Sequence, residues 1–469
     1  MKLLFRKIQD LIQTTFLGTR RAIEDVVVSM VPQAVSVVTG FLTSILVARG
    51  LGPKGMGSYA LILSVSGLAA ALSDLGISQT AIRFASRAAD NHDREGQFAV
   101  LRWAFRLRML LVVAVSLLAF IFAPVVADRI WHEQSLAGFV RISLLIGLFS
   151  ALASIPTIYF QSLKRFKMNA VVSVGQTLAA FVGILAIAVK QSWSIDHVIW
   201  VSVVAGGLGA IVFMVLVPRD SFLRSRDFDR PLSSLPMGLL RAPRLDSDST
   251  MDKTGANSFA FFMVLSSILV SVTLRADVWL MGFFLDKADV GRYSVATRFT
   301  LPLVIVLGAL NTALWPRASA LVTLEKTVET MKKTLKMSVL LSLGAVAYSI
   351  IAPLATPYVF GSTYAQGILL AQILCIRYCL SLLICPIGVI GYSFGMVRVY
   401  WVINLLQLLS VIGCNVFLLP RIGAVGAAWA LVVNEIIGFV LSAVFIRRRI
   451  LEMKRNESFI VKEISTENP

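Results

Sequence analysis

The chain has 469 residues, of which 57% are hydrophobic and only 15% are charged, which excludes an ordinary soluble domain. Its formal net charge of +18 would suit a nucleic-acid partner, but no basic soluble domain is present to carry such a site, so we expect none. The three histidines are scattered, and no P-loop or other nucleotide motif occurs. These features argue against a metal site, a cofactor and direct use of ATP.

Apolar runs of about 20 residues recur along the chain, and each is long enough to cross about 30 Å of hydrocarbon as a helix. The pattern predicts an all-α polytopic membrane protein with about 12 transmembrane helices. The four cysteines fall inside these spans, where we expect small apolar packing residues and not metal ligands. The expected spans are residues 26–48, 59–82, 108–127, 137–161, 169–189, 196–217, 258–284, 292–316, 337–359, 365–394, 397–419 and 423–446.

Three segments lie outside these spans. Residues 1–25 form an amphipathic segment flanked by Arg and Lys, which is typical of a helix on the inner membrane surface and not of a cleavable signal peptide. Residues 218–256 are rich in Arg, Asp, Ser and Pro, so we expect a mobile cytoplasmic linker. Residues 447–469 form a cytoplasmic tail.

The positions of Lys and Arg predict the orientation. One set of span ends carries 33 of the 44 basic residues and the opposite set carries seven, while four lie within spans. Cytoplasmic ends are the positive ones, so both termini are expected in the cytoplasm.

An internal repeat indicates duplication. Residues 51–59 and 285–293 share a pattern in which Gly57 corresponds to Gly291 and Tyr59 to Tyr293, 234 positions apart. Later pairs continue the series at offsets near 230, among them Gln176 with Gln407 and Trp200 with Trp429. Because six spans separate the copies, the bundles 26–217 and 257–446 enter the membrane in the same direction. We therefore expect a pseudo-two-fold axis along the membrane normal.

The ordered motifs resemble those of the polysaccharide transporter family, the Wzx-type flippases of the multidrug/oligosaccharidyl-lipid/polysaccharide (MOP) superfamily. The similarity covers nearly the whole chain apart from the tails and the linker. The motifs are LGPKGMGSY (51–59), DLGISQ (74–79), DVWLMG (277–282), VGRYSVA (290–296), FGSTY (360–364) and PRIGAVGAA (420–428).

This resemblance implies two six-helix bundles in a V around a central cavity. It also implies that a polyprenyl-diphosphate-linked oligosaccharide is moved from the cytoplasmic to the outer leaflet of a bacterial inner membrane, for O-antigen, exopolysaccharide or capsule synthesis. The implied partners are that substrate, membrane lipids, a polysaccharide polymerase or chain-length machinery, and an H⁺ or Na⁺ counter-ion. The alternatives are a multidrug cation antiporter of the same superfamily and a glycan polymerase or ligase. The short outer loops argue against the enzyme.

Diphosphate recognition calls for fixed cations, and arginine offers planar bidentate donors. The substrate-binding candidates are Arg49, Arg275, Arg298 and Arg377. The resemblance places the first, second, seventh and eighth spans around the cavity mouth, which favours the first three. Three of the four have a structural alternative: snorkelling for Arg49, a local pair with Asp277 for Arg275, and a buried pair with Glu435 for Arg377.

Asp74, Asp277 and Glu435 are the acids within spans and therefore the candidates for ion coupling; a salt bridge or a helix-end hydrogen bond is the alternative reading. Arg83 and Arg317 occupy equivalent inner ends of spans two and eight, where they would bind headgroups or meet incoming diphosphate at the cytoplasmic mouth. Gly57, Gly291, Tyr59 and Tyr293 are expected to form tight turns and interfacial anchors. Arg141 is expected to snorkel to the outer interface.

Overall fold

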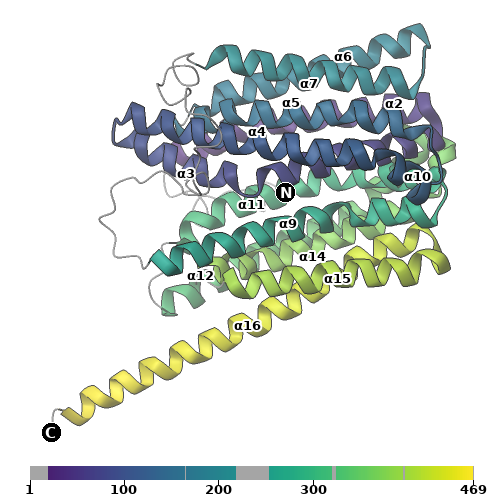
Figure 1. Cartoon of the computed structure of the whole chain (residues 1–469). Helices are drawn as coiled ribbons and strands as arrows, with labels where there is room; N and C mark the ends of the chain where they lie inside the picture. Colours follow the sequence, from purple (N-terminus) through teal and green to yellow (C-terminus); the bar gives the residue numbers. More distant parts are fainter. Residues whose placement is uncertain (1–19, 164, 218–252, 320–323, 394–396, 468–469) are drawn as a thin grey trace. The chain divides into compact units, whose positions relative to one another are not determined.

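The computed structural model describes residues 20–163, 165–217, 253–319, 324–393 and 397–467, and the described part is helical throughout, joined by short turns (Figure 1). Most of the expected N-terminal surface helix and of the expected linker lies outside these residues. The longer helices are α2 (Arg20–Asp74), α3 (Ile77–Asp90), α4 (Arg94–Val125), α5 (Leu136–Ser162), α6 (Phe166–Lys190), α7 (Ile195–Leu216), α9 (Lys253–Phe284), α10 (Lys287–Ala296), α11 (Leu301–Ser319), α12 (Leu324–Ile351), α14 (Gly367–Ser393), α15 (Val397–Ile422) and α16 (Ala424–Glu467). The short elements are the π-helix η1 (Val126–Ile130), the 3₁₀-helices η5 (Thr297–Thr300), η6 (Ala352–Ala355) and η7 (Ser362–Tyr364), and the α-helix α13 (Thr356–Val359).

Within these residues, 11 helices are long and apolar enough to cross a membrane. One of them, Ala34–Asp74, is 41 residues long, far more than a single crossing requires. It is interrupted at Gly52, whose φ of 66° and ψ of 178° are not helical. Gly52 lies between the first and second expected spans and adopts a positive φ that glycine tolerates without strain. The break accounts for the difference between 11 helices and 12 expected spans.

Large apolar side chains cover much of the surface, for example Leu117, Val189 and Val215, of which the last two are 77% exposed. Apolar surface of this extent suits hydrocarbon and not water. Together with the long apolar helices, it identifies a multi-pass membrane protein.

The chain divides into two compact units, residues 28–295 and residues 296–469 with the first 27 residues. The division falls within the expected eighth span, so α9 and most of α10 belong to the 28–295 unit. The expected division into bundles 26–217 and 257–446 concerns the duplicated sequence and stays a prediction.

In the 28–295 unit, α5 packs against α4 and α7, and α6 packs against α7 (Figure 1). The short helix α3 lies on α4 and α5. A buried apolar cluster joins these three helices through side chains such as Ile77, Leu101 and Phe160. This cluster stabilises the end of the unit at which α2 stops and α3 begins.

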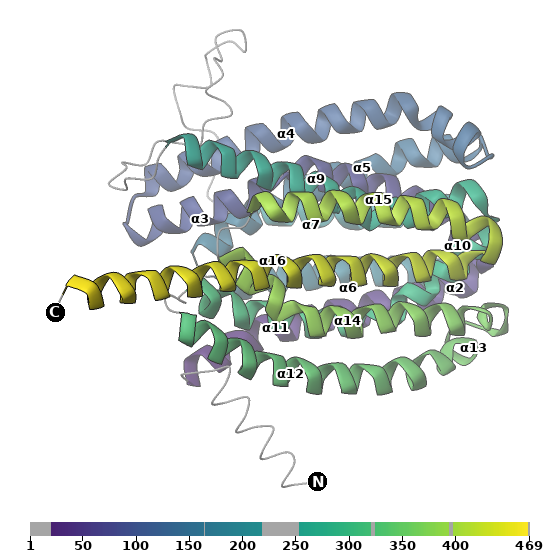
Figure 2. The same cartoon turned by 90° about the horizontal axis from the view of Figure 1, so that it is seen from below.

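In the 296–469 unit, α14 is central and contacts α11, α12 and α16. Helix α15 pairs with α16, and the C-terminal part of α16 extends beyond the other helices of the unit (Figure 2).

The two units contain the same helix contact at repeat-related positions. A Cβ added to Gly209 of α7 would lie 2.7 Å from Cδ of Gln176 in α6, and one added to Gly438 of α16 would lie 2.3 Å from Nε2 of Gln407 in α15. In each copy a glycine therefore makes room for the glutamine of the preceding helix. This recurrence within separate units is the arrangement that duplicated bundles should show.

Candidate functional site

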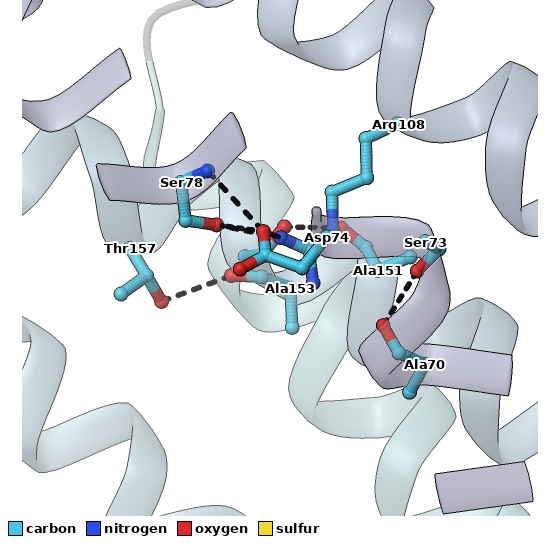
Figure 3. Close-up of polar contacts among 9 residues, drawn as sticks. Ala70, Ser73, Asp74, Ser78, Arg108, Ala151, Ala153 and Thr157 are labelled. Carbon is cyan, nitrogen blue, oxygen red and sulfur yellow. Dashed lines mark hydrogen bonds and ion pairs between the residues drawn. The ribbon is translucent and has the colours of Figure 1, made fainter. Parts of the chain in front are cut away.

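The junction between α2 and α3 contains the first of the three candidate acids. Helix α2 ends at Asp74, and the next two residues have positive φ, 41° for Leu75 and 79° for Gly76. One Asp74 carboxylate oxygen accepts the backbone N–H of Ser78 at 3.2 Å and the Ser78 hydroxyl at 2.6 Å (Figure 3). Asp74 thus binds a donor in the first turn of α3, as an N-terminal capping residue does.

Arg108 of α4 completes this cluster. Its Nη1 forms an ion pair with the Asp74 carboxylate and also donates to the Ser78 hydroxyl at 2.6 Å (Figure 3). The Arg108 side chain is 7% exposed and that of Asp74 is 33% exposed. The sequence places Arg108 among the basic residues at the inner span ends and does not by itself predict its pairing with Asp74. A usable signal was that both residues lie toward the inner ends of consecutive antiparallel spans.

Asp277 of α9 is satisfied by protein donors. The hydroxyl of Tyr293, from α10, donates to one carboxylate oxygen, and the backbone N–H of Val278 donates to the other at 2.8 Å. Asp277 is 7% exposed and Tyr293 is fully buried. The expectation that Tyr293 is an interfacial anchor is therefore wrong, because its ring packs inside the unit and its hydroxyl binds a buried acid.

Arg275 lies two residues before Asp277 and is exposed. Its guanidinium lies over Gly67 of α2, where an added Cβ would be 2.8 Å from an Arg275 Nη atom. Within the described part of the chain, Arg275 forms no ion pair or hydrogen bond, and the local pair with Asp277 does not form. The missing side chain of Gly67 leaves room for this cation.

The repeated motifs meet each other inside the 28–295 unit. A Cβ on Gly57 would lie 1.8 Å from the carbonyl oxygen of Lys287, and one on Gly291 would lie 2.0 Å from that of Pro53. Both glycines lie within helices and not in turns, so the expected tight-turn role is wrong for both. Their role is instead to let the backbones of the two motifs approach each other closely. An ion pair between Lys287 and Glu133 lies beside this crossing.

Tyr59 is half-buried, and its hydroxyl is 3.2 Å from the hydroxyl of Ser202 in α7. Its hydroxyl therefore has a partner within the helical unit.

Arg377, a candidate substrate contact, and Glu435, a candidate for ion coupling, lie together in the 296–469 unit. Nε of Arg377 in α14 is 3.4 Å from Oε2 of Glu435 in α16, and each side chain is 17% exposed. Arg377 also lies over the ring of Tyr378, with 5.3 Å from its Cζ to the ring centroid. Arg298 is half-buried on η5 in the same unit.

The structure places the other basic candidates individually. Arg49 is exposed, and Arg141 donates from Nε to the Phe120 carbonyl at 3.4 Å and stacks on that ring. The side chains of Arg83 and Arg317 lie outside the described set, so their role at the cytoplasmic mouth stays a prediction. No group of three or more His, Cys, Asp or Glu suited to a metal ion occurs among the residues described.

Residues 22–322 match the family described as polysaccharide biosynthesis protein. The chain belongs to this family. The matched residues of this chain include both copies of the repeated motif, 51–59 and 285–293, and so both the Gly57–Gly291 crossing and the Asp74 cluster.

Among curated proteins, this polysaccharide biosynthesis family member is 22% identical over 395 residues to a putative O-antigen transporter of Shigella flexneri, covering 81% of this chain and 87% of that one. Among solved structures, it resembles an inward-facing multidrug resistance MATE family transporter of the MOP superfamily, with a TM-score of 0.68, 14% identity and coverage of 91% and 99%. It also resembles the lipid II flippase MurJ, with a TM-score of 0.66, 14% identity and coverage of 94% and 93%. The fold is therefore that of the MOP superfamily.

Proposed function

We propose that this protein flips a polyprenyl-diphosphate-linked oligosaccharide repeat unit from the cytoplasmic to the outer leaflet by alternating access, for synthesis of a cell-surface polysaccharide. The observation that carries the proposal is the family match over residues 22–322. The similarity to a putative O-antigen transporter over 395 residues supports it. The fold shared with a lipid II flippase agrees with it.

The unpaired cation on α9 is the feature best suited to the substrate. A charged residue at the bilayer centre costs about 2.5–3.5 kcal/mol on insertion scales, so such residues usually have a partner or face water. Arg275 is exposed and has no acidic partner among the described side chains. A diphosphate would supply that partner through paired N–H···O bonds. We assign Arg275 as the first contact for the diphosphate, with Arg49 and Arg298 as further candidates.

Arg377 ranks lower as a substrate contact, because Glu435 neutralises it. For coupling to H⁺ or Na⁺, the candidates are Asp74, Asp277 and Glu435. Each already interacts with protein donors, so coupling would require the ion to compete with Arg108, Tyr293 or Arg377. Among them, Asp74 is the most accessible, at 33% side-chain exposure.

The proposal includes a location and partners. We place the protein in a bacterial inner membrane with both termini in the cytoplasm, because basic residues concentrate at one set of span ends. A polymerase or chain-length regulator would receive the flipped repeat unit. Accessibility of single cysteines introduced at residues 2 and 466 to an impermeant thiol reagent in intact cells tests the orientation; labelling of either would refute it.

A multidrug cation antiporter is the second candidate, and the shared fold with a MATE family transporter favours it. That function needs an acid able to bind a cationic substrate or its counter-ion. The engagement of Asp74 by Arg108 and of Asp277 by Tyr293 argues against it.

The test is a clean deletion of the gene, with assays of surface polysaccharide and of the leaflet that holds the lipid-linked repeat unit. We expect loss of polymer, repeat units retained in the cytoplasmic leaflet and restoration by the intact gene. Normal polymer with altered drug susceptibility would refute the flippase and favour the antiporter. In-vitro polymerisation by the pure protein would instead show an enzyme.

A further inference from the structure

A cavity of about 460 Å³ opens between α6 and α7 in the 28–295 unit, within the range of roughly 300–1,000 Å³ found for small-molecule sites. Its walls are mainly small or apolar, and Ala179, Gly183 and Ala186 of α6 face Val204 and Leu208 of α7. Val204 is 54% exposed and Leu208 is 52% exposed, so the cavity opens on the surface that faces hydrocarbon.

The hollow follows from the spacing of small residues along two antiparallel helices. Its lining runs from residue 179 to 190 on α6 and from 197 to 208 on α7. At about 1.5 Å per residue, eleven residues extend roughly 16 Å, about half the thickness of a hydrocarbon core of about 30 Å. The groove therefore spans one leaflet, which is the depth that a single acyl chain of a phospholipid occupies.

One end of the groove is cationic. Lys190, the last residue of α6, is exposed and has no hydrogen bond or ion pair within the described part of the chain. Nδ1 of His197 donates to the backbone carbonyl of Ser192 at 2.8 Å, which leaves Nε2 of its ring for another partner. Lys190, Ser192 and His197 all line the cavity. The ammonium of Lys190, the hydroxyl of Ser192 and the imidazole of His197 therefore surround one end of an apolar groove.

The other copy of the repeat uses the equivalent cation differently. Arg421 lies 231 residues after Lys190, the same offset that relates Gln176 to Gln407. Its guanidinium donates to the Phe417 carbonyl at 2.7 Å, and its Cζ lies 3.6 Å from the centre of the Phe417 ring. The charge of Arg421 is therefore directed to its own helix, whereas that of Lys190 is available at the groove.

We propose that the α6–α7 groove is a binding site for an anionic glycerophospholipid, with one acyl chain between the helices and the phosphate held by Lys190 and, when its ring carries a proton on both nitrogens, by His197. The apolar walls match the chain, the length matches one leaflet and the cation complements the phosphate. A polyprenyl chain is much longer than one leaflet, so the site is not the path of the transported lipid. The inference goes beyond the proposed function and does not depend on what the protein transports.

Native mass spectrometry of the purified full-length chain tests the site with three added lipids: phosphatidylglycerol, diacylglycerol, which lacks the phosphate, and polyprenyl phosphate. We expect wild-type protein to bind phosphatidylglycerol in preference to the other two. Lys190→Gln should weaken that binding about fivefold, the effect of one cation near an anionic lipid. Ala186→Phe should abolish it by filling the groove. The matched control, Arg421→Gln, should bind as wild type does.

Equal binding by wild type and Lys190→Gln would overturn the proposal, as would an equal loss in Arg421→Gln. Displacement of phosphatidylglycerol by polyprenyl phosphate would also overturn it, because the groove would then belong to the transported lipid. Lys190 is exposed, so its replacement should leave the fold intact, which the gel-filtration profile checks. If Ala186→Phe does not fold, the double variant Lys190→Gln/His197→Gln decides the outcome in its place, since unchanged binding would refute the phosphate contacts.

Discussion

Gly57 and Gly291 pack backbone against backbone, and their contacts are reciprocal. The position of a Cβ on Gly57 is occupied by the carbonyl oxygen of Lys287, and that on Gly291 by the carbonyl oxygen of Pro53. Pro53 and Lys287 are themselves related by the repeat offset of 234. Each copy of the motif therefore contacts the other through the same surface, as in an isologous two-fold interface. The repeat found in the sequence is a local two-fold contact in the structure.

This contact predicts that Gly57→Ala and Gly291→Ala each disrupt the crossing. A Cβ at 1.8 or 2.0 Å from a carbonyl oxygen forces the two backbones apart, and overpacking of this kind typically costs about 1–3 kcal/mol or more. We expect a lower unfolding temperature in detergent for both variants. Gly40→Ala is the control, because nothing lies within 4 Å of its added Cβ. Unchanged unfolding temperatures for Gly57→Ala and Gly291→Ala would contradict the contact.

The Asp74–Arg108 pair gives a second prediction, which separates a structural acid from a coupling acid. Removing one partner of a buried pair costs about 3–5 kcal/mol, and we expect the lower end because the Asp74 side chain is one-third exposed. Asp74→Asn and Arg108→Gln should each lower stability, and the double variant should lose less than the sum. Thermal unfolding of the single and double variants measures the interaction energy between Asp74 and Arg108. The exposed Arg87→Gln is the control.

Polymer output of the same variants tests the role of Asp74. If the acid is structural, the double variant recovers output relative to Arg108→Gln alone. If output is absent in every variant that lacks the carboxylate, while the protein stays folded at wild-type level, then Asp74 couples the ion and the structural interpretation is refuted.

Much of the fold could be predicted because length and apolarity are local properties. Twenty apolar residues require a spanning helix whatever they pack against, and the repeat was visible in residues such as Gln176 and Gln407. Partners could not be predicted in the same way. Arg108 lies 34 residues after its partner Asp74, and Tyr293 lies on the helix that follows its partner Asp277. The charge of Arg108 and the hydroxyl of Tyr293 would also suit headgroup contacts. Only tertiary packing distinguishes a buried partner from an interfacial anchor.

For Arg377 and Glu435, the alternatives are a structural pair and a substrate contact. Exchanging the two residues, Arg377→Glu with Glu435→Arg, keeps an ion pair between α14 and α16 but moves the cation to the other helix. A structural pair should tolerate the exchange better than either single change, as measured by unfolding temperature and polymer output. Recovery of stability without recovery of output would show instead that the position of the cation matters for transport.

Arg275 gives the prediction that bears most directly on substrate binding. Its guanidinium is exposed and has no ion pair within the described structure, so Arg275→Ala removes no protein contact of that kind and should leave the unfolding temperature nearly unchanged. Polymer output should fall at least tenfold, because the diphosphate would lose a charge-assisted contact. Arg275→Lys should recover part of the output, since lysine keeps the charge without the bidentate geometry. Arg141→Ala is the matched control, a span arginine that stacks on Phe120. Wild-type output from Arg275→Ala at equal protein level would exclude Arg275 as a substrate contact.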